Sequence, residues 1–129
     1  MSGERRTLDA DGAPAAVGPY SHAVSAAGLL FCSGQIPLDA ATGELVGDTP
    51  AEQARRCLEN LEAVCAAGGT SLAAAVKLTV YMTDLGAFAA VNEVYATFFE
   101  GVDPPARVAV GVAALPKGAL VEIDAIVAP

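Results

Sequence analysis

Residues that usually build metal and thiol sites are scarce in this sequence. Its single histidine, His22, cannot form a histidine metal cluster, and a Ser-His-Asp mechanism would depend on it alone without a nucleophile elbow. The three cysteines, Cys32, Cys57 and Cys65, include no CxxC pair and have no clustered histidines. Because disulfide scaffolds and zinc sites need paired or closely spaced ligands, we expect three buried, reduced thiols and no bound metal.

Positive charge is scarce as well. Seven Lys and Arg residues oppose 15 Asp and Glu residues, which gives a formal net charge of −8 and a pI near 4.3. The basic residues are scattered along the chain, at Arg5, Arg6, Arg55, Arg56, Lys77, Arg107 and Lys117. Because an acidic chain without a basic patch repels phosphate backbones, we expect no nucleic-acid partner.

Long apolar runs are missing. No stretch approaches the roughly 20 consecutive apolar residues of a membrane-spanning helix, so we expect no membrane partner. The first twelve residues, MSGERRTLDADG, lack the apolar core and cleavage site of a signal peptide. The expected location is therefore the cytoplasm.

Apolar residues are nevertheless abundant in total. They make up 53 % of the chain, the mean hydropathy is +0.47, and charged residues make up only 17 %. A chain of 129 residues is long enough for one domain, which we expect to span residues 1–129. Since so few charges remain to solvate the outside, we expect an oligomer that buries a second apolar surface.

Two helices are predicted. The first begins at a capping box formed by Thr49 and Glu52 and ends at Gly68-Gly69, with apolar residues recurring at helical spacing between them. The second is expected to be capped by Asp84 and to stop at Gly101. Its predicted apolar stripe is Phe88, Val91, Val94, Tyr95 and Phe98.

Strand patterns surround these helices. Short runs joined by Gly-containing turns and alternating apolar residues predict strands over residues 20–26, 29–33, 75–83, 106–112 and 120–127. Residues 1–12 are expected to form a polar arm or a first edge strand. The resulting order, β-β-α-β-α-β-β, predicts an α+β layer in which both helices cover one face of the sheet.

The other face of that sheet would remain bare. The residues predicted to point toward the helices are Val76, Leu78, Val80, Met82, Val108, Val110, Val112, Val121, Ile123, Ala125 and Val127. The bare face would then carry Lys77, Tyr81, Arg107, Glu122 and Asp124. Such a face is exposed to solvent or packs against other subunits, and the apolar composition favours subunits.

Arg107 and Glu122 are the main candidates for chemistry. Arg107 follows the rigid Pro104-Pro105 pair, and the small residues Ala109 and Gly111 share its side of the strand, which leaves space for a ligand beside the guanidinium. The planar guanidinium matches a carboxylate through two parallel hydrogen bonds. Glu122 lies in an otherwise apolar strand, where a buried carboxylate needs a purpose or a partner. The structural alternative is a plain Arg107–Glu122 salt bridge or an ion pair between subunits.

Four further residues are weaker candidates for the site. Tyr20 follows a Gly-Pro turn that would fix its phenol, although a lone tyrosine is usually core or interface filler. Asn92 lies near the edge of the second helix's apolar stripe, where solvated residues are common. Ser33 and Gly34 end a strand and could offer a hydroxyl and free backbone amides, or could simply form a turn.

Four ordered segments resemble the RidA (YjgF) family of reactive-intermediate deaminases over residues 13–127. The matching segments are Ala15-Ala16-Val17-Gly18-Pro19-Tyr20-Ser21, Phe31-Cys32-Ser33-Gly34-Gln35-Ile36-Pro37, Val91-Asn92-Glu93-Val94-Tyr95, and Pro105-Ala106-Arg107 with Leu115-Pro116-Lys117 and Val121-Glu122-Ile123. The resemblance implies a chorismate-mutase-like fold with a mixed six-stranded sheet. It also implies a homotrimer with clefts between subunits.

The same resemblance implies an activity that needs no cofactor or metal. Family members hydrolyse 2-imino acids and their enamine tautomers, such as 2-iminobutanoate and 2-iminopropanoate, to 2-keto acids and ammonia. Arg107 would bind the substrate carboxylate, and Glu122 would position water and move protons. The matching pocket positions are Tyr20, Ser33, Gly34, Asn92 and Ala109.

The sequence departs from the family pattern beside the arginine. Ala109 replaces a frequent cysteine, Val108 a frequent Ser or Thr, and Gly111 a frequent Glu, while His22 stands where Gln is common. These changes predict a wider or more apolar pocket. They also motivate an alternative, a non-catalytic trimer that binds small carboxylates. A ribonuclease activity, attributed to some relatives, is disfavoured by the charge of −8.

Overall fold

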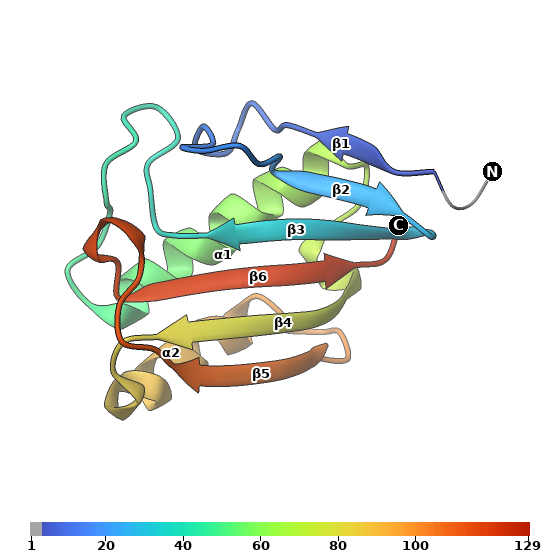
Figure 1. The fold of residues 1–129 in the computed structure, drawn as a ribbon. Helices are drawn as coiled ribbons and strands as arrows, with labels where there is room; N and C mark the ends of the chain where they lie inside the picture. Colours follow the sequence, from blue (N-terminus) through green and yellow to red (C-terminus); the bar gives the residue numbers. More distant parts are fainter. Residues whose placement is uncertain (1–3) are drawn as a thin grey trace.

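The computed structural model describes residues 4–129 and places six strands in one sheet (Figure 1). The strands are β1 (Arg6–Leu8), β2 (Ala23–Ala26), β3 (Leu29–Gln35), β4 (Ala75–Met82), β5 (Ala106–Gly111) and β6 (Val121–Val127). Their order across the sheet is β1-β2-β3-β6-β4-β5. Only the β4–β5 pair is parallel, so the sheet is mixed, as predicted.

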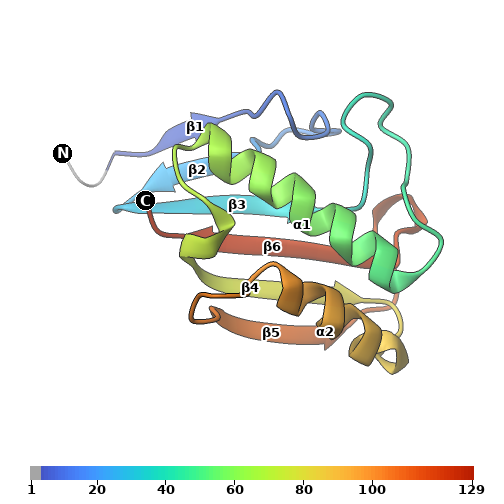
Figure 2. The same cartoon turned by 180° about the vertical axis from the view of Figure 1, so that it is seen from behind.

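Both helices, α1 (Pro50–Ala67) and α2 (Phe88–Thr97), cover one face of the sheet (Figure 2). Residues 4–129 also contain three 3₁₀ turns, which are η1 (Leu72–Ala74), η2 (Leu85–Ala87) and η3 (Pro116–Gly118). The predicted α+β layer is therefore confirmed. The optional N-terminal strand is present as β1, while residues 1–3 of the predicted arm lie outside the described residues.

Helix α1 begins and ends where the sequence predicts. The Thr49 side chain accepts a hydrogen bond from the Glu52 N–H at 3.2 Å, and the Glu52 carboxylate accepts one from the Thr49 N–H at 3.2 Å. These reciprocal bonds satisfy amides that have no partner inside the helix. Its fully buried residues Leu58, Leu61 and Val64 pack onto the sheet and form the centre of the core.

Helix α2 begins later than predicted. Asp84 is a cap, but its carboxylate accepts from the Gly86 N–H at 2.8 Å and caps η2, and the α-helix starts at Phe88. The buried stripe runs through Val91, Tyr95 and Phe99 at a constant spacing of four residues. The expected stripe residue Phe98 is only partly buried, because it lies one position off this line.

The alternation of β6 matches the prediction, while β4 departs from it at one end. Val121, Ile123, Ala125 and Val127 are all buried beneath the helices. On β4 a register irregularity between Ala75 and Lys77 interrupts the pairing with β6. This bulge turns Val76 away from the core, and its side chain is 47 % exposed.

The predicted orientation of β5 is wrong. In the parallel register Arg107 pairs with Leu78, Ala109 with Val80 and Gly111 with Met82. Because laterally paired residues share a face, Arg107, Ala109 and Gly111 lie on the helix-covered side, and Val108 and Val110 lie on the bare side. Alternation determines which residues share a face, but on this edge strand, with apolar residues on both faces, it does not say which face meets the helices.

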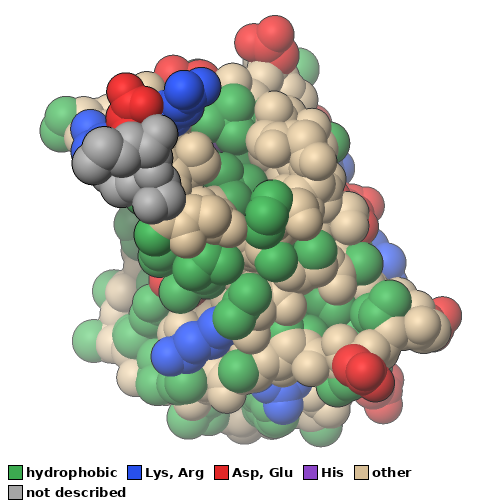
Figure 3. All heavy atoms as spheres, turned by 90° about the vertical axis from the view of Figure 1, so that its right-hand side faces the viewer, with side chains coloured by type: hydrophobic (Ala, Val, Ile, Leu, Met, Phe, Trp, Pro, Cys, Tyr) green, Lys and Arg blue, Asp and Glu red, His purple; other side chains and the backbone are tan. Residues whose placement is uncertain are grey.

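Apolar side chains remain exposed on the bare face. Phe31 is 41 % exposed and Val108 is 40 % exposed, and both lie on this side of the sheet. The Tyr81 hydroxyl donates to the Asp124 carboxylate at 2.9 Å across the same face. Figure 3 views the end of the sheet at the right-hand side of Figure 1, where hydrophobic side chains are exposed as well, between charged groups.

Candidate functional site

Glu122 lies in a cavity of about 340 Å³ on the bare face of the sheet. The cavity, hereafter the Glu122 cavity, is lined by Val17, Tyr20, Ser33, Gly34, Ile36, Pro116 and Glu122. Partial burial of the carboxyl group, together with the nearby charge of Asp124, raises the pKa of Glu122 above its ordinary value. The carboxyl group in this cavity therefore loses its proton at a higher pH than an exposed glutamate does.

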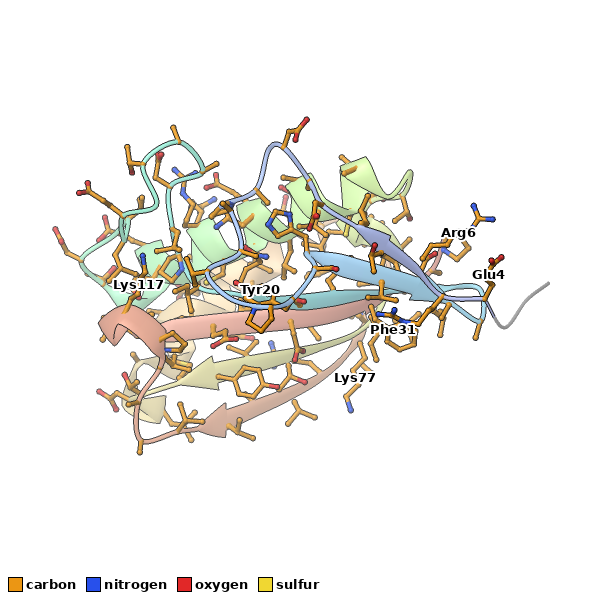
Figure 4. All side chains as sticks on the ribbon, turned by 45° about the horizontal axis from the view of Figure 1, so that its top comes forward. Glu4, Arg6, Tyr20, Phe31, Lys77 and Lys117 are labelled. Atoms are coloured by element: carbon orange, nitrogen blue, oxygen red, sulfur yellow. The ribbon has the colours of Figure 1, made fainter. Side chains whose placement is uncertain are left out.

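Two segments far from Glu122 in sequence bring polar groups into the Glu122 cavity. Tyr20 lies on the loop before β2, which passes over the sheet on the side away from the helices (Figure 4), and its side chain is 46 % exposed. Ser33 lies on β3, where its hydroxyl donates to the Ser21 carbonyl at 2.6 Å. A register shift between Cys32 and Gln35 leaves Ser33 and Gly34 without Cα partners on β6, which frees this part of β3 to face the cavity.

The Glu122 side chain lies so close to the backbone at position 34 that only glycine fits there. A Cβ atom at this position would overlap the Oε2 atom of Glu122 and would crowd its Cδ at 3.0 Å. The missing side chain of Gly34 therefore makes the space that the Glu122 carboxylate occupies.

Arg107 lies beside a second cavity, of about 480 Å³, on the helix side of β5. Its Nη1 donates to Oδ1 of Asn92 at 2.6 Å. The guanidinium carbon lies 5.1 Å from the Phe88 ring centroid and 4.8 Å from the Tyr95 ring centroid. The predicted residues Arg107 and Asn92 are thus in direct contact, and Ala109 is half-buried on the same side, packed against the core.

The predicted site residues therefore form two groups on opposite faces of the sheet. Arg107 is level with Leu78 and Ala125, which face the helices, whereas Glu122 is level with Tyr81 on the bare face. The alternative of an Arg107–Glu122 ion pair is wrong within one chain, since the guanidinium bonds Asn92 instead.

His22 is a structural residue. Its Nδ1 accepts a hydrogen bond from the Ala10 N–H at 2.8 Å, so the proton resides on Nε2, which donates to the Pro14 carbonyl at 2.7 Å. The ring is only 4 % exposed. Both nitrogens are occupied in holding residues 10–14 against the start of β2, which leaves no lone pair for catalysis.

The cysteines agree with the expectation of buried thiols. Cys32, Cys57 and Cys65 are all free and buried, and burial raises the pKa of the Cys57 thiol well above its ordinary value. Within residues 4–129 no three His, Cys, Asp or Glu side chains come together as a metal site would require. No helix in this part of the chain is long and apolar enough to cross a membrane.

Some residues around the two cavities were not among the candidates. Val17, Ile36 and Pro116 form apolar walls of the Glu122 cavity, and Phe88 and Tyr95 contact Arg107. The first three lie inside the segments that carry the family resemblance, which was their only signal. The two aromatic residues belong to the predicted apolar stripe of the second helix. The spacing of that stripe indicates burial but does not predict a contact with Arg107.

The α+β fold is shared with solved structures of the YjgF type. The crystal structure of the YjgF gene product from E. coli matches with a TM-score of 0.90 at 42 % identity, covering 95 % of this chain and 98 % of that chain. The crystal structure of E. coli TdcF with bound serine gives 0.91 at 42 % identity, covering 96 % and 98 %.

Sequence comparison then identifies the family. Residues 10–129 match the Endoribonuclease L-PSP family. Protein DfrA from Myxococcus xanthus is 53 % identical, over 95 % of this chain and 94 % of that protein. The 2-iminobutanoate/2-iminopropanoate deaminase from Mus musculus is 44 % identical, over 95 % of this chain and 90 % of that protein. The chain belongs to the RidA (YjgF, L-PSP) family, which confirms the resemblance found in the sequence.

Proposed function

We propose that this protein hydrolyses 2-imino acids and their enamine tautomers, with 2-iminobutanoate and 2-iminopropanoate as substrates. The products are the 2-keto acid and ammonia. The observation that carries the proposal is the Glu122 carboxyl group, with its raised pKa, in a cavity beside Tyr20 and Ser33. Family membership supports it, because relatives at 44 % identity are named as deaminases of these two imines.

The chemistry requires one group that binds and one that moves protons. The substrate carbon of a C=N bond is already electrophilic, so a positioned water can attack it while the Glu122 carboxylate accepts a proton from that water. A C–O bond forms and the C=N double bond becomes single. Glu122 returns this proton to the nitrogen, which gives a neutral carbinolamine. The carboxylate then takes the proton of the new hydroxyl group and passes it to the nitrogen. The C–N bond breaks and ammonia leaves as the C=O bond forms.

Arg107 is proposed to bind the substrate carboxylate. Its Nη1 is held by Asn92, and the Nε and Nη2 atoms on the other edge of the guanidinium have no hydrogen-bond acceptor among residues 4–129. These two N–H groups are parallel and match the two oxygens of a carboxylate. The carboxylate is common to all 2-imino acids, so this contact would orient the substrate without selecting its side chain.

One chain cannot supply both groups to one substrate, because Arg107 and Glu122 lie on opposite faces of the sheet. We therefore propose a homotrimer in which each active site lies in a cleft between copies, with Arg107 from one subunit and Glu122, Tyr20, Ser33 and Gly34 from its neighbour. Strand β5 is at the edge of the sheet, where Arg107 can reach a neighbouring molecule. The exposed apolar residues of the bare face would be buried by the same assembly.

The walls of the Glu122 cavity suit small, apolar substrate side chains. Val17 and Ile36 offer hydrocarbon surface, and no basic group lines the cavity. Ala109 is proposed to contribute through its backbone carbonyl, since its methyl group packs against the core. A short alkyl group, such as those of 2-iminobutanoate and 2-iminopropanoate, fits these surroundings.

The proposal is tested with a coupled assay. Threonine dehydratase generates 2-iminobutanoate, and semicarbazide traps the imine that survives. We expect purified protein to suppress formation of the trapped product in proportion to its concentration. Unchanged trapping of both 2-iminobutanoate and 2-iminopropanoate would contradict the deaminase, and calorimetric binding of 2-ketobutanoate would then support the non-catalytic carboxylate binder.

Gly34→Ala is expected to reduce the rate of imine loss by about 10-fold or more, because the added methyl displaces the Glu122 carboxylate. The Tm should change little, since the displaced atoms are the end of a flexible side chain. Gly12→Ala is the matched control, because there an added Cβ meets only the Cβ of Ala63, at an ordinary 3.5 Å. Equal activity of the two variants would show that the position of Glu122 does not matter.

A further inference from the structure

The guanidinium of Arg107 lies against two aromatic rings of α2. Phe88, Asn92 and Tyr95 are spaced by four and three residues, which places them on one side of the helix, facing β5. The two ring centroids are 5.1 and 4.8 Å from the guanidinium carbon, and Asn92 holds Nη1 at 2.6 Å. Three side chains of one helix therefore contact the same cation.

We propose that Phe88 and Tyr95 are positioning residues that hold the Arg107 guanidinium in the plane needed to bind the substrate carboxylate. This inference rests on the proposed function of Arg107. A long arginine side chain on an exposed edge strand can adopt many orientations. Two parallel hydrogen bonds to a carboxylate form only when the guanidinium lies in the plane of that carboxylate. The faces of the two aromatic rings attract the cation and limit the orientations of the guanidinium before the substrate binds.

These contacts fix one side of the guanidinium and leave the other side free to bind a ligand. Asn92 and the two rings hold the Nη1 end and the face, while Nε and Nη2 keep their N–H groups for the carboxylate. The Tyr95 ring is itself fixed, because it is only 5 % exposed and packs against Phe99 with centroids 4.9 Å apart. A ring that is itself fixed can hold the Arg107 guanidinium in a fixed position.

At Tyr95 the effect of the aromatic ring can be measured separately from the effect of the hydroxyl group. Its hydroxyl oxygen is buried and has no hydrogen-bond partner among residues 4–129. Tyr95→Phe therefore removes a polar atom without a partner and keeps the ring that faces Arg107. Tyr95→Leu removes the ring as well.

The test compares KM and kcat for 2-iminobutanoate in four variants. Tyr95→Leu and Phe88→Leu are expected to raise KM by about 10-fold with kcat changed much less, because the contact with the carboxylate persists from ground state to transition state. Tyr95→Phe is expected to keep the wild-type KM. Phe98→Leu is the matched control, since the Phe98 ring lies 5.9 Å from Arg55 and belongs to another cation–π pair.

Three results would overturn this inference. They are wild-type KM values in Tyr95→Leu and Phe88→Leu, an equal rise of KM in Tyr95→Phe, or an equal rise in Phe98→Leu. If Tyr95→Leu does not fold, Phe88→Leu decides, because Phe88 is only partly buried. Arg107→Ala, measured in parallel, separates the two proposals, since full activity of that variant would refute the proposed role of Arg107 itself.

Discussion

Replacing Arg107 by lysine is expected to raise the KM for 2-iminobutanoate by roughly 10- to 150-fold, which corresponds to losing one charge-assisted hydrogen bond of about 1.5–3 kcal/mol. Lysine keeps the positive charge but presents a point charge instead of a planar fork. It also loses the contacts with Asn92 and with the rings of Phe88 and Tyr95. Arg107→Ala removes the charge too and is expected to lower kcat/KM further.

The measurement is steady-state kinetics in the coupled assay. Arg55→Ala is a suitable control, because Arg55 also lies over an aromatic ring, that of Phe98, but far from β5 along the chain. It changes the net charge of the protein by the same amount as Arg107→Ala. Wild-type kinetics in Arg107→Lys would contradict two-point binding of the carboxylate.

Glu122→Gln is expected to reduce kcat by about 10²- to 10⁴-fold, because the amide can neither accept a proton from water nor return it to nitrogen. KM should change much less, since the proposed contact with the substrate carboxylate is made by Arg107. Loss of binding with an unchanged kcat would assign Glu122 to substrate binding and contradict its role in proton transfer.

The same substitution is expected to stabilise the protein at neutral pH. The pKa of Glu122 is higher in the folded chain than its ordinary value of 4.5, so ionisation of this carboxyl opposes folding. That cost is complete above the folded pKa and disappears below the unfolded pKa. Glu122→Gln should therefore raise the Tm at about pH 7 and leave it nearly unchanged at about pH 4.

Glu62→Gln provides the comparison for both effects. Partial burial and the charge of Glu59 raise the pKa of Glu62 as well, but it lies on α1, outside both cavities. Its replacement should show the same trend of Tm with pH and no loss of activity. A fall in the Tm of Glu122→Gln at neutral pH would indicate that the ionised carboxylate stabilises the fold.

Local signals predicted much of the fold. The capping box at Thr49 and Glu52 gave the start of α1, because reciprocal hydrogen bonds are short-range. The alternation of β6 was correct because this central strand lies between β3 and β4, with one face under the helices and the other bare. Features set by pairing between strands, such as the bulge beside Val76, had no local signal.

The sequence predicted which residues belong to the candidate site but not how they are arranged in space. Tyr20, Ser33, Gly34 and Glu122 meet in one cavity although three separate segments supply them. Arg107 was assigned to the wrong face, because Val108, Ala109, Val110 and Gly111 make both sides of β5 apolar. Its true position depends on the parallel pairing with β4 and on the rings of α2, both of which are tertiary contacts.

The central claim is that each site combines Arg107 of one subunit with Glu122 of another, and hybrid oligomers test it most directly. Arg107→Ala and Glu122→Gln subunits, each expected to have little activity alone at low substrate concentration, are co-expressed with different affinity tags, and only assemblies carrying both tags are purified. A hybrid trimer with head-to-tail contacts then contains one intact site, so we predict about a third of wild-type activity. Hybrids no more active than the separate variants would contradict a site shared between subunits.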